Sequence, residues 1–81
     1  MAIFFLTIMA IENIHGIEVK IEDGHSDSIK KLIYGWKNHE TDFKEMCHSV
    51  GHDPNNKIYI GNIVFEKRDG RYILRKSSSS N

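Results

Sequence analysis

Two turn signals near the C-terminus constrain the fold more than any other feature of the chain. Gly61-Asn62 lies between the apolar runs "KIYI" and "IVFEK", and Asp69-Gly70 precedes "RYILRK". Glycine at the first central position favours a type II′ turn, and Asp-Gly favours a type I′ turn, both of which close two-residue hairpins. The sequence therefore predicts a three-stranded meander over residues 57–60, 63–67 and 71–76.

The same two turns set which residues of neighbouring strands face each other. Facing residues share one side of a sheet, so the meander has an apolar side and a basic side. The apolar side contains Ile58, Ile60, Ile63, Phe65, Tyr72 and Leu74. The basic side contains Lys57, Tyr59, Val64, Glu66, Arg68, Arg71, Ile73 and Arg75. We expect the apolar side to face the core and the basic side to stay open.

The N-terminal third of the chain predicts a second pair of strands. "IFFLTIMAI" (3–11) is apolar at both parities, as in a strand that is covered on both faces. "IEVKIED" (17–23) alternates strictly between apolar and charged residues, as a half-buried strand does. We expect these segments to form an antiparallel hairpin whose loop contains Gly16.

The middle of the chain has helical periodicity. Apolar residues recur at helical spacing between Ile29 and Val50, but "KNHETD" in between is polar throughout. We expect helices at about 27–37 and 41–50, although one long helix is also compatible with the spacing. Ser26 or Asp27 provides the N-cap. Gly51 is expected to end the second helix, because glycine is the commonest residue after a helix C-terminus.

These elements predict one small α+β domain over residues 1–76, in the order ββ-α(α)-βββ. We expect an antiparallel sheet with the helical segment packed on one face. Residues 77–81, "SSSSN", are expected to be a disordered tail. The predicted core contains Ile17, Val19, Ile21, Ile29, Leu32, Ile33, Trp36, Phe43, Met46, Val50, Ile58, Ile60, Phe65 and Leu74.

The formal net charge is zero, but the charges are unevenly distributed. Residues 1–56 have five Lys and nine acidic residues, whereas residues 57–81 have six basic residues and two acidic ones. Such asymmetry indicates an acidic partner or head-to-tail self-association. A basic sheet face can also hold phosphates and stack a base on an aromatic ring. The candidate nucleic-acid-binding residues are Lys57, Tyr59, Arg68, Arg71 and Arg75.

"KIYIGNI" (57–63) is similar to the shorter motif of RNA-recognition domains. In that family the strand leads into a helix, whereas a hairpin follows here, so we assign no family. "IVFEKRDGRYIL" also resembles the wing of a winged helix, but the residues between Gly51 and Gly61 are too few for a recognition helix. Our first hypothesis is a small non-catalytic regulatory protein that binds RNA or single-stranded nucleic acid.

Two other functions remain open. The first is a protein–protein adaptor or inhibitor that acts through the acidic half or the apolar N-terminal strand. The second is a small metal-free ribonuclease-like toxin. His48, His52 and Cys47 resemble a zinc-ligand pattern, but a helix that ended at Gly51 would separate the two histidines. We therefore expect no metal, no cofactor and no catalytic residue.

The N-terminal strand is expected to mediate a homodimer. Its residues Ile3, Phe4, Phe5, Leu6 and Ile8 form an apolar set that one sheet and one helical layer cannot bury on both faces. The run is too short for a membrane span, which needs about 20 residues, so we expect no membrane partner. A single cysteine allows no internal disulfide, and we expect a cytoplasmic location.

Overall fold

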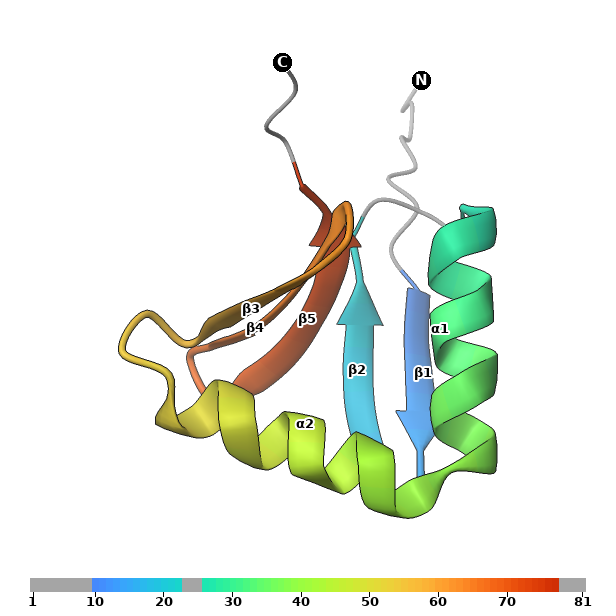
Figure 1. The fold of residues 1–81 in the computed structure, drawn as a ribbon, viewed down its shortest axis with the longest axis horizontal. Coiled ribbons are helices and arrows are strands. Elements are labelled where there is room, and N and C mark those ends of the chain that lie inside the picture. The colour runs from blue at the N-terminus through green and yellow to red at the C-terminus, as the bar shows by residue number, and fades with distance from the viewer. Residues whose placement is uncertain (1–9, 23–25, 78–81) are drawn as a thin grey trace, which may run out of the picture.

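A computed structural model describes residues 10–22 and 26–77 of the chain. These residues form β1 (Ala10–Ile14), β2 (Ile17–Ile21), α1 (Asp27–Asn38), α2 (Glu40–His52), β3 (Lys57–Ile60), β4 (Ile63–Arg68) and β5 (Arg71–Lys76). The order confirms the predicted α+β class. In Figure 1, α1 runs alongside β1, and α2 crosses the lower ends of the strands.

The five strands form one sheet in the order β1-β2-β5-β4-β3. Neighbouring strands are antiparallel except at the centre, where β2 and β5 are parallel and Val19 faces Tyr72. The sheet is therefore mixed, where we expected only antiparallel pairs. Each antiparallel pair follows from a tight turn. The parallel pair joins a hairpin and a meander that are connected through both helices, and no local signal sets its direction.

The predicted turns are confirmed by backbone geometry. Asp69 and Gly70 both have positive φ, at 53° and 77°, as a type I′ turn requires. Gly61 has a φ of 60° and Asn62 does not have a positive φ, as expected for type II′. The first hairpin uses His15-Gly16, with φ of 51° and 86°.

The ends of the described segments bear on two expectations. Only the last part of the predicted 3–11 strand is described, and β1 continues beyond it to Ile14, which is fully buried. Residues 3–9 lie outside the described residues. At the other end, the Ser77 N–H donates to the Asn62 carbonyl at 2.8 Å, so residue 77 is tied to the β3–β4 turn. The rest of the predicted tail, 78–81, also lies outside the described residues.

The helical segment is broken as expected, but α2 is longer than predicted. Ser26 caps α1, with its Oγ accepting from the Ile29 N–H at 3.3 Å. His39 separates the two helices. Gly51 does not end α2, which continues to His52 and is capped by Asp53. After α2 the backbone changes direction at Asn56, which adopts a φ of 54°. The Asn56 Nδ2 holds this turn against the helix end by donating to the Val50 carbonyl at 3.1 Å.

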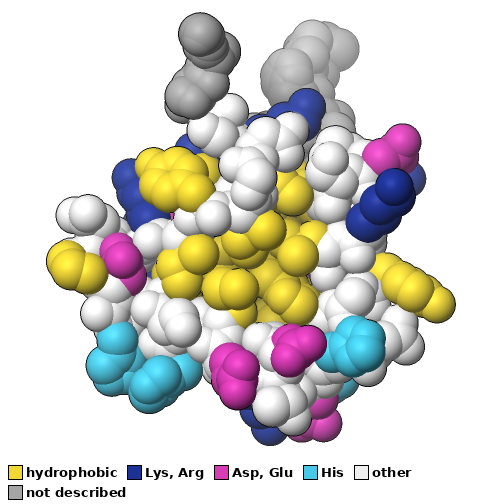
Figure 2. Space-filling model, in the orientation of Figure 1, with side chains coloured by type: hydrophobic (Ala, Val, Ile, Leu, Met, Phe, Trp, Pro, Cys, Tyr) yellow, Lys and Arg dark blue, Asp and Glu magenta, His cyan; other side chains and the backbone are white. Residues whose placement is uncertain are grey.

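The core lies between the helices and the apolar side of the sheet. An aromatic cluster at its centre joins both helices to β4. The ring centroid of Trp36 lies 5.1 Å from that of Phe43 and 4.9 Å from that of Phe65. Most predicted core residues are buried, whereas Ile17, Leu32, Met46, Ile58 and Ile60 are partly exposed at its edge. Figure 2 shows hydrophobic side chains gathered at the centre of the helix-bearing face.

Candidate functional site

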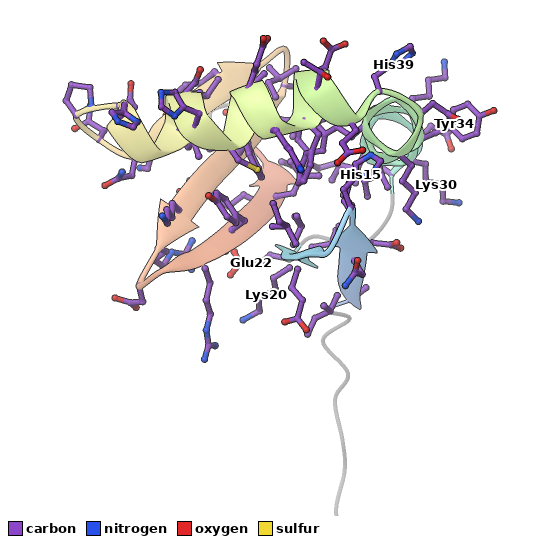
Figure 3. The ribbon with its side chains drawn as sticks, turned by 90° about the horizontal axis from the view of Figure 1, so that it is seen from below. His15, Lys20, Glu22, Lys30, Tyr34 and His39 are labelled. Carbon is purple, nitrogen blue, oxygen red and sulfur yellow. The ribbon has the colours of Figure 1, made fainter. Side chains whose placement is uncertain are left out.

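The candidate site is the side of the sheet that faces away from the helices, which we call the outer face. In the view from below, both helices lie on one side of the sheet, and Lys20 and Glu22 point to the other (Figure 3). The observed register pairs Tyr59 with Val64 and Val64 with Arg75. The other residue pairs of the three-stranded meander also have the register predicted from its two turns. The structure thus brings the five candidate residues, Lys57, Tyr59, Arg68, Arg71 and Arg75, onto one face.

The parallel β2–β5 pairing adds residues to the outer face that sequence analysis had not assigned to it. Lys20 pairs with Ile73, which in turn pairs with Glu66. Glu18 and Glu22 flank Lys20 on the same side of β2. The outer face therefore carries Glu18, Lys20 and Glu22 on β2 as well as the basic groups of the meander. The signal that could have revealed them is the strict alternation of β2, but its neighbour in the sheet was unknown.

Glu66 is a buried carboxylate on this face that forms ion pairs with two arginines. Its side chain is 5% exposed. Arg75 Nη2 donates to its Oε1 at 3.2 Å, and Arg68 Nη2 donates to its Oε2. Arg68 also donates from Nη1 to Glu22 Oε2 at 3.1 Å. Two of the predicted phosphate-binding arginines are thus held in ion pairs within the protein.

The charge balance around Glu66 favours its ionised form. Burial by itself raises the pKa of the carboxyl, but the hydrogen bonds and positive charges of Arg75 and Arg68 outweigh it and lower the pKa below its usual value. The hydrogen bonds of Arg68 to Glu66 and to Glu22 raise the pKa of its guanidinium. The three groups therefore form a fixed cluster. The Nε atom of Arg75 is buried without a hydrogen-bond partner in the described part of the chain.

Val64 and Ile73 correct the expectation that the outer face is open. Both were assigned to it, yet they are only 1% and 3% exposed. In the register of the sheet, each of these two residues has a longer side chain on both neighbouring strands, which accounts for its burial. Val64 lies between Tyr59 and Arg75, and Ile73 lies between Glu66 and Lys20. Of the three uncharged residues assigned to this face, Tyr59, Val64 and Ile73, only Tyr59 is exposed.

Tyr59 is accessible, and two basic residues of this face form no ion pair with a described residue. Tyr59 is 63% exposed on the edge strand β3. Lys57 is two residues away on the same side and is half-buried. Arg71 is exposed at the start of β5 and has no ion pair with any described residue. These groups provide a planar aromatic surface and two cationic side chains.

A shallow hollow adjoins the basic part of the outer face. Its volume is about 500 Å³, and it lies at the lower end of the β2–β5 junction. Ile11, 65% exposed, supplies an apolar wall. The full lining is Ile11, Ile17, Glu18, Lys20, Gly70, Arg71 and Tyr72. The hollow has both charged and apolar walls, and it extends the accessible surface beside Arg71.

Cys47 and His15 are side chains with nucleophilic or acid–base chemistry that have structural contacts in this fold. Cys47 is 6% exposed, and burial raises the pKa of its thiol, which makes it a poor nucleophile. The His15 Nε2–H donates to the Trp36 carbonyl at 2.7 Å, so this ring joins the first hairpin to α1. The described residues contain no group of three or more His, Cys, Asp or Glu side chains arranged to hold a metal ion.

Comparison of the chain with protein-family models, curated proteins and solved structures finds no match. Among the described residues, no helix has the length and apolar character needed to cross a membrane. The predicted dimer residues Ile3, Phe4, Phe5, Leu6 and Ile8 lie outside the described residues.

Proposed function

We propose that the protein is a small non-catalytic binding module whose outer face contacts single-stranded RNA. The observation that carries this proposal is the 63% exposure of Tyr59 on a sheet face that also presents Lys57 and Arg71. A base stacks on an aromatic ring regardless of sequence, while basic side chains follow the phosphates. Glu66 supports this arrangement because it holds Arg68 and Arg75 in defined positions.

The test is binding of a fluorescently labelled single-stranded RNA, measured by anisotropy at low salt. Tyr59→Ala should weaken binding by about 1–3 kcal/mol. Tyr34→Ala is the matched control, because Tyr34 is 72% exposed on α1 and points away from the sheet (Figure 3). An equal effect of the two substitutions, or no binding by the unmodified protein, rejects the proposal.

The electrostatic part is tested with Lys57→Ala and Arg71→Ala. Each lost phosphate contact should reduce the slope of log K against log salt by about 0.7 for a single strand. Lys30→Ala, on the exposed side of α1 (Figure 3), should leave the slope unchanged. Arg68 and Arg75 are poorer probes, because their removal also takes a partner from buried Glu66.

A protein–protein adaptor is the second candidate. It is favoured by the hydrophobic side chains at the centre of the helix-bearing face in Figure 2. Leu32, Ile58 and Ile60 keep part of their surface exposed at the edge of the core. Under this proposal, Leu32→Lys abolishes capture of a protein partner and leaves RNA binding unchanged, whereas Tyr59→Ala has the opposite pattern.

A further inference from the structure

The last two turns of α2 place two histidine rings against each other. His48 and His52 are both exposed, and their ring centroids lie 4.1 Å apart with an angle of 32° between the planes. Residues four apart are neighbours on a helix surface. This arrangement depends on the continuation of α2 through Gly51, which a helix ending at that glycine would not have allowed.

A hydrogen bond prepares one of the rings for coordination. His52 Nδ1 lies 2.9 Å from the His48 carbonyl oxygen. A carbonyl only accepts, so Nδ1 carries the proton and donates it. In the neutral ring, Nε2 then has a free lone pair. Proteins commonly orient a metal-binding histidine in this way, with the N–H of the nitrogen that does not bind the metal donating to a backbone carbonyl.

The position on the helix also favours a cation. The pair lies in the last turns of α2, where the helix dipole contributes partial negative charge. Lys44, which is also on α2, lies one turn before His48 but is engaged with Glu40 at 2.9 Å. Glu45, with no resolved positive partner in the described residues, lines a shallow hollow beside His48.

We propose that His48 and His52 bind one divalent late first-row transition-metal ion through their imidazole nitrogens. Two nitrogens about 2.1 Å from a tetrahedral ion are about 3.4 Å apart, and two adjacent nitrogens about 2.0 Å from a tetragonal ion such as Cu²⁺ are about 2.8 Å apart. Rotation of these two exposed, tilted rings brings their nitrogens to either separation. Two side chains leave further coordination positions to water. By the Irving–Williams order, this site binds Cu²⁺ more tightly than Ni²⁺ or Zn²⁺.

The test is calorimetric titration of the untagged chain with CuCl₂ in a buffer that does not chelate metals. The unmodified protein should bind one ion at this site. His48→Ala and His52→Ala should each weaken binding by about a hundredfold, because the second donor no longer binds intramolecularly. His39→Ala, at the junction of the helices, is the control and should bind as the unmodified protein does.

A second measurement separates chelation from independent binding and from loss of fold. Because chelation requires the folded helix, Cu²⁺ should raise the unfolding temperature of the unmodified protein and of His39→Ala but not of the other two variants. Circular dichroism should show all of them folded, since both rings are exposed. The proposal is overturned if the single variants keep the affinity and lose only half the stoichiometry, or if they bind Cu²⁺ as tightly as His39→Ala.

Discussion

The contacts of Glu66 change how much positive charge the outer face presents. From its position in the meander it counts as a single acid among four basic groups on the outer face. In the structure its side chain is 5% exposed and binds Arg68 and Arg75. The face is therefore less positive than its composition indicates, and Lys57 and Arg71 are the candidate basic residues that form no ion pair with a described residue.

The ion pairs of Glu66 predict a specific loss of stability in acid. Its pKa in the folded protein lies below the usual 4.5. A lowered pKa stabilises the fold above that usual value, and this contribution is lost as the pH falls through the folded-state pKa. Glu66→Gln should therefore cost about 1–3 kcal/mol at neutral pH and flatten the decline below pH 4.5, as measured by urea unfolding across pH.

Glu18→Gln is the matched control, because Glu18 is an exposed carboxylate on β2 of the same sheet. It should unfold at the same urea concentration as the unmodified protein at neutral pH and keep the same acid dependence. If Glu66→Gln loses stability in acid with the slope of the unmodified chain, the carboxylate does not have the role described here.

At the scale of elements, we expect one surface substitution in α2 to increase the free energy of unfolding. Gly51 lies inside the helix without a positive φ, and a Cβ there would meet nothing within 4 Å. Gly51→Ala should therefore stabilise the protein by about 0.5–1 kcal/mol, mainly by reducing the freedom of the unfolded chain. Thermal unfolding measures the change.

Gly70→Ala is the corresponding control in a turn, where φ is +77°. This substitution should destabilise the protein by about 1–2 kcal/mol, because an L side chain is strained in the left-handed region. A loss of stability in Gly51→Ala as well would mean that α2 does end at residue 51 in solution.

The elements also show which features a sequence can predict. The turns at Gly61-Asn62 and Asp69-Gly70 have strong local preferences, so the register and the placement of all five candidate residues followed from them. Gly51 has no such unique meaning, since glycine occurs both inside helices and after them. The parallel β2–β5 contact and the pairing of Glu22 with Arg68 depend on long-range packing, which no short segment encodes.

For the whole molecule, the proposed homodimer remains to be tested. Among the described strands, β1 lies at an edge of the sheet, and Ile11 on it is 65% exposed. An unpaired edge can add a strand from a second chain, and the apolar residues 3–8 immediately precede this strand. Light scattering at micromolar concentration should give the mass of a dimer for the full chain and of a monomer for a variant that begins at Met9. A monomeric full chain rejects the dimer.

The central place of β5 has a consequence for the order of synthesis. Of the described strands, β5 is the last to be made, yet it lies between β2 and β4 and supplies the contact between the first hairpin and the rest of the sheet. The other four strands are synthesised before this connection can form. The two parts of the sheet must therefore wait with unpaired edges, and such edges are where nascent chains aggregate. Folding of this sheet is thus completed after translation of residue 76, rather than progressively from the N-terminus.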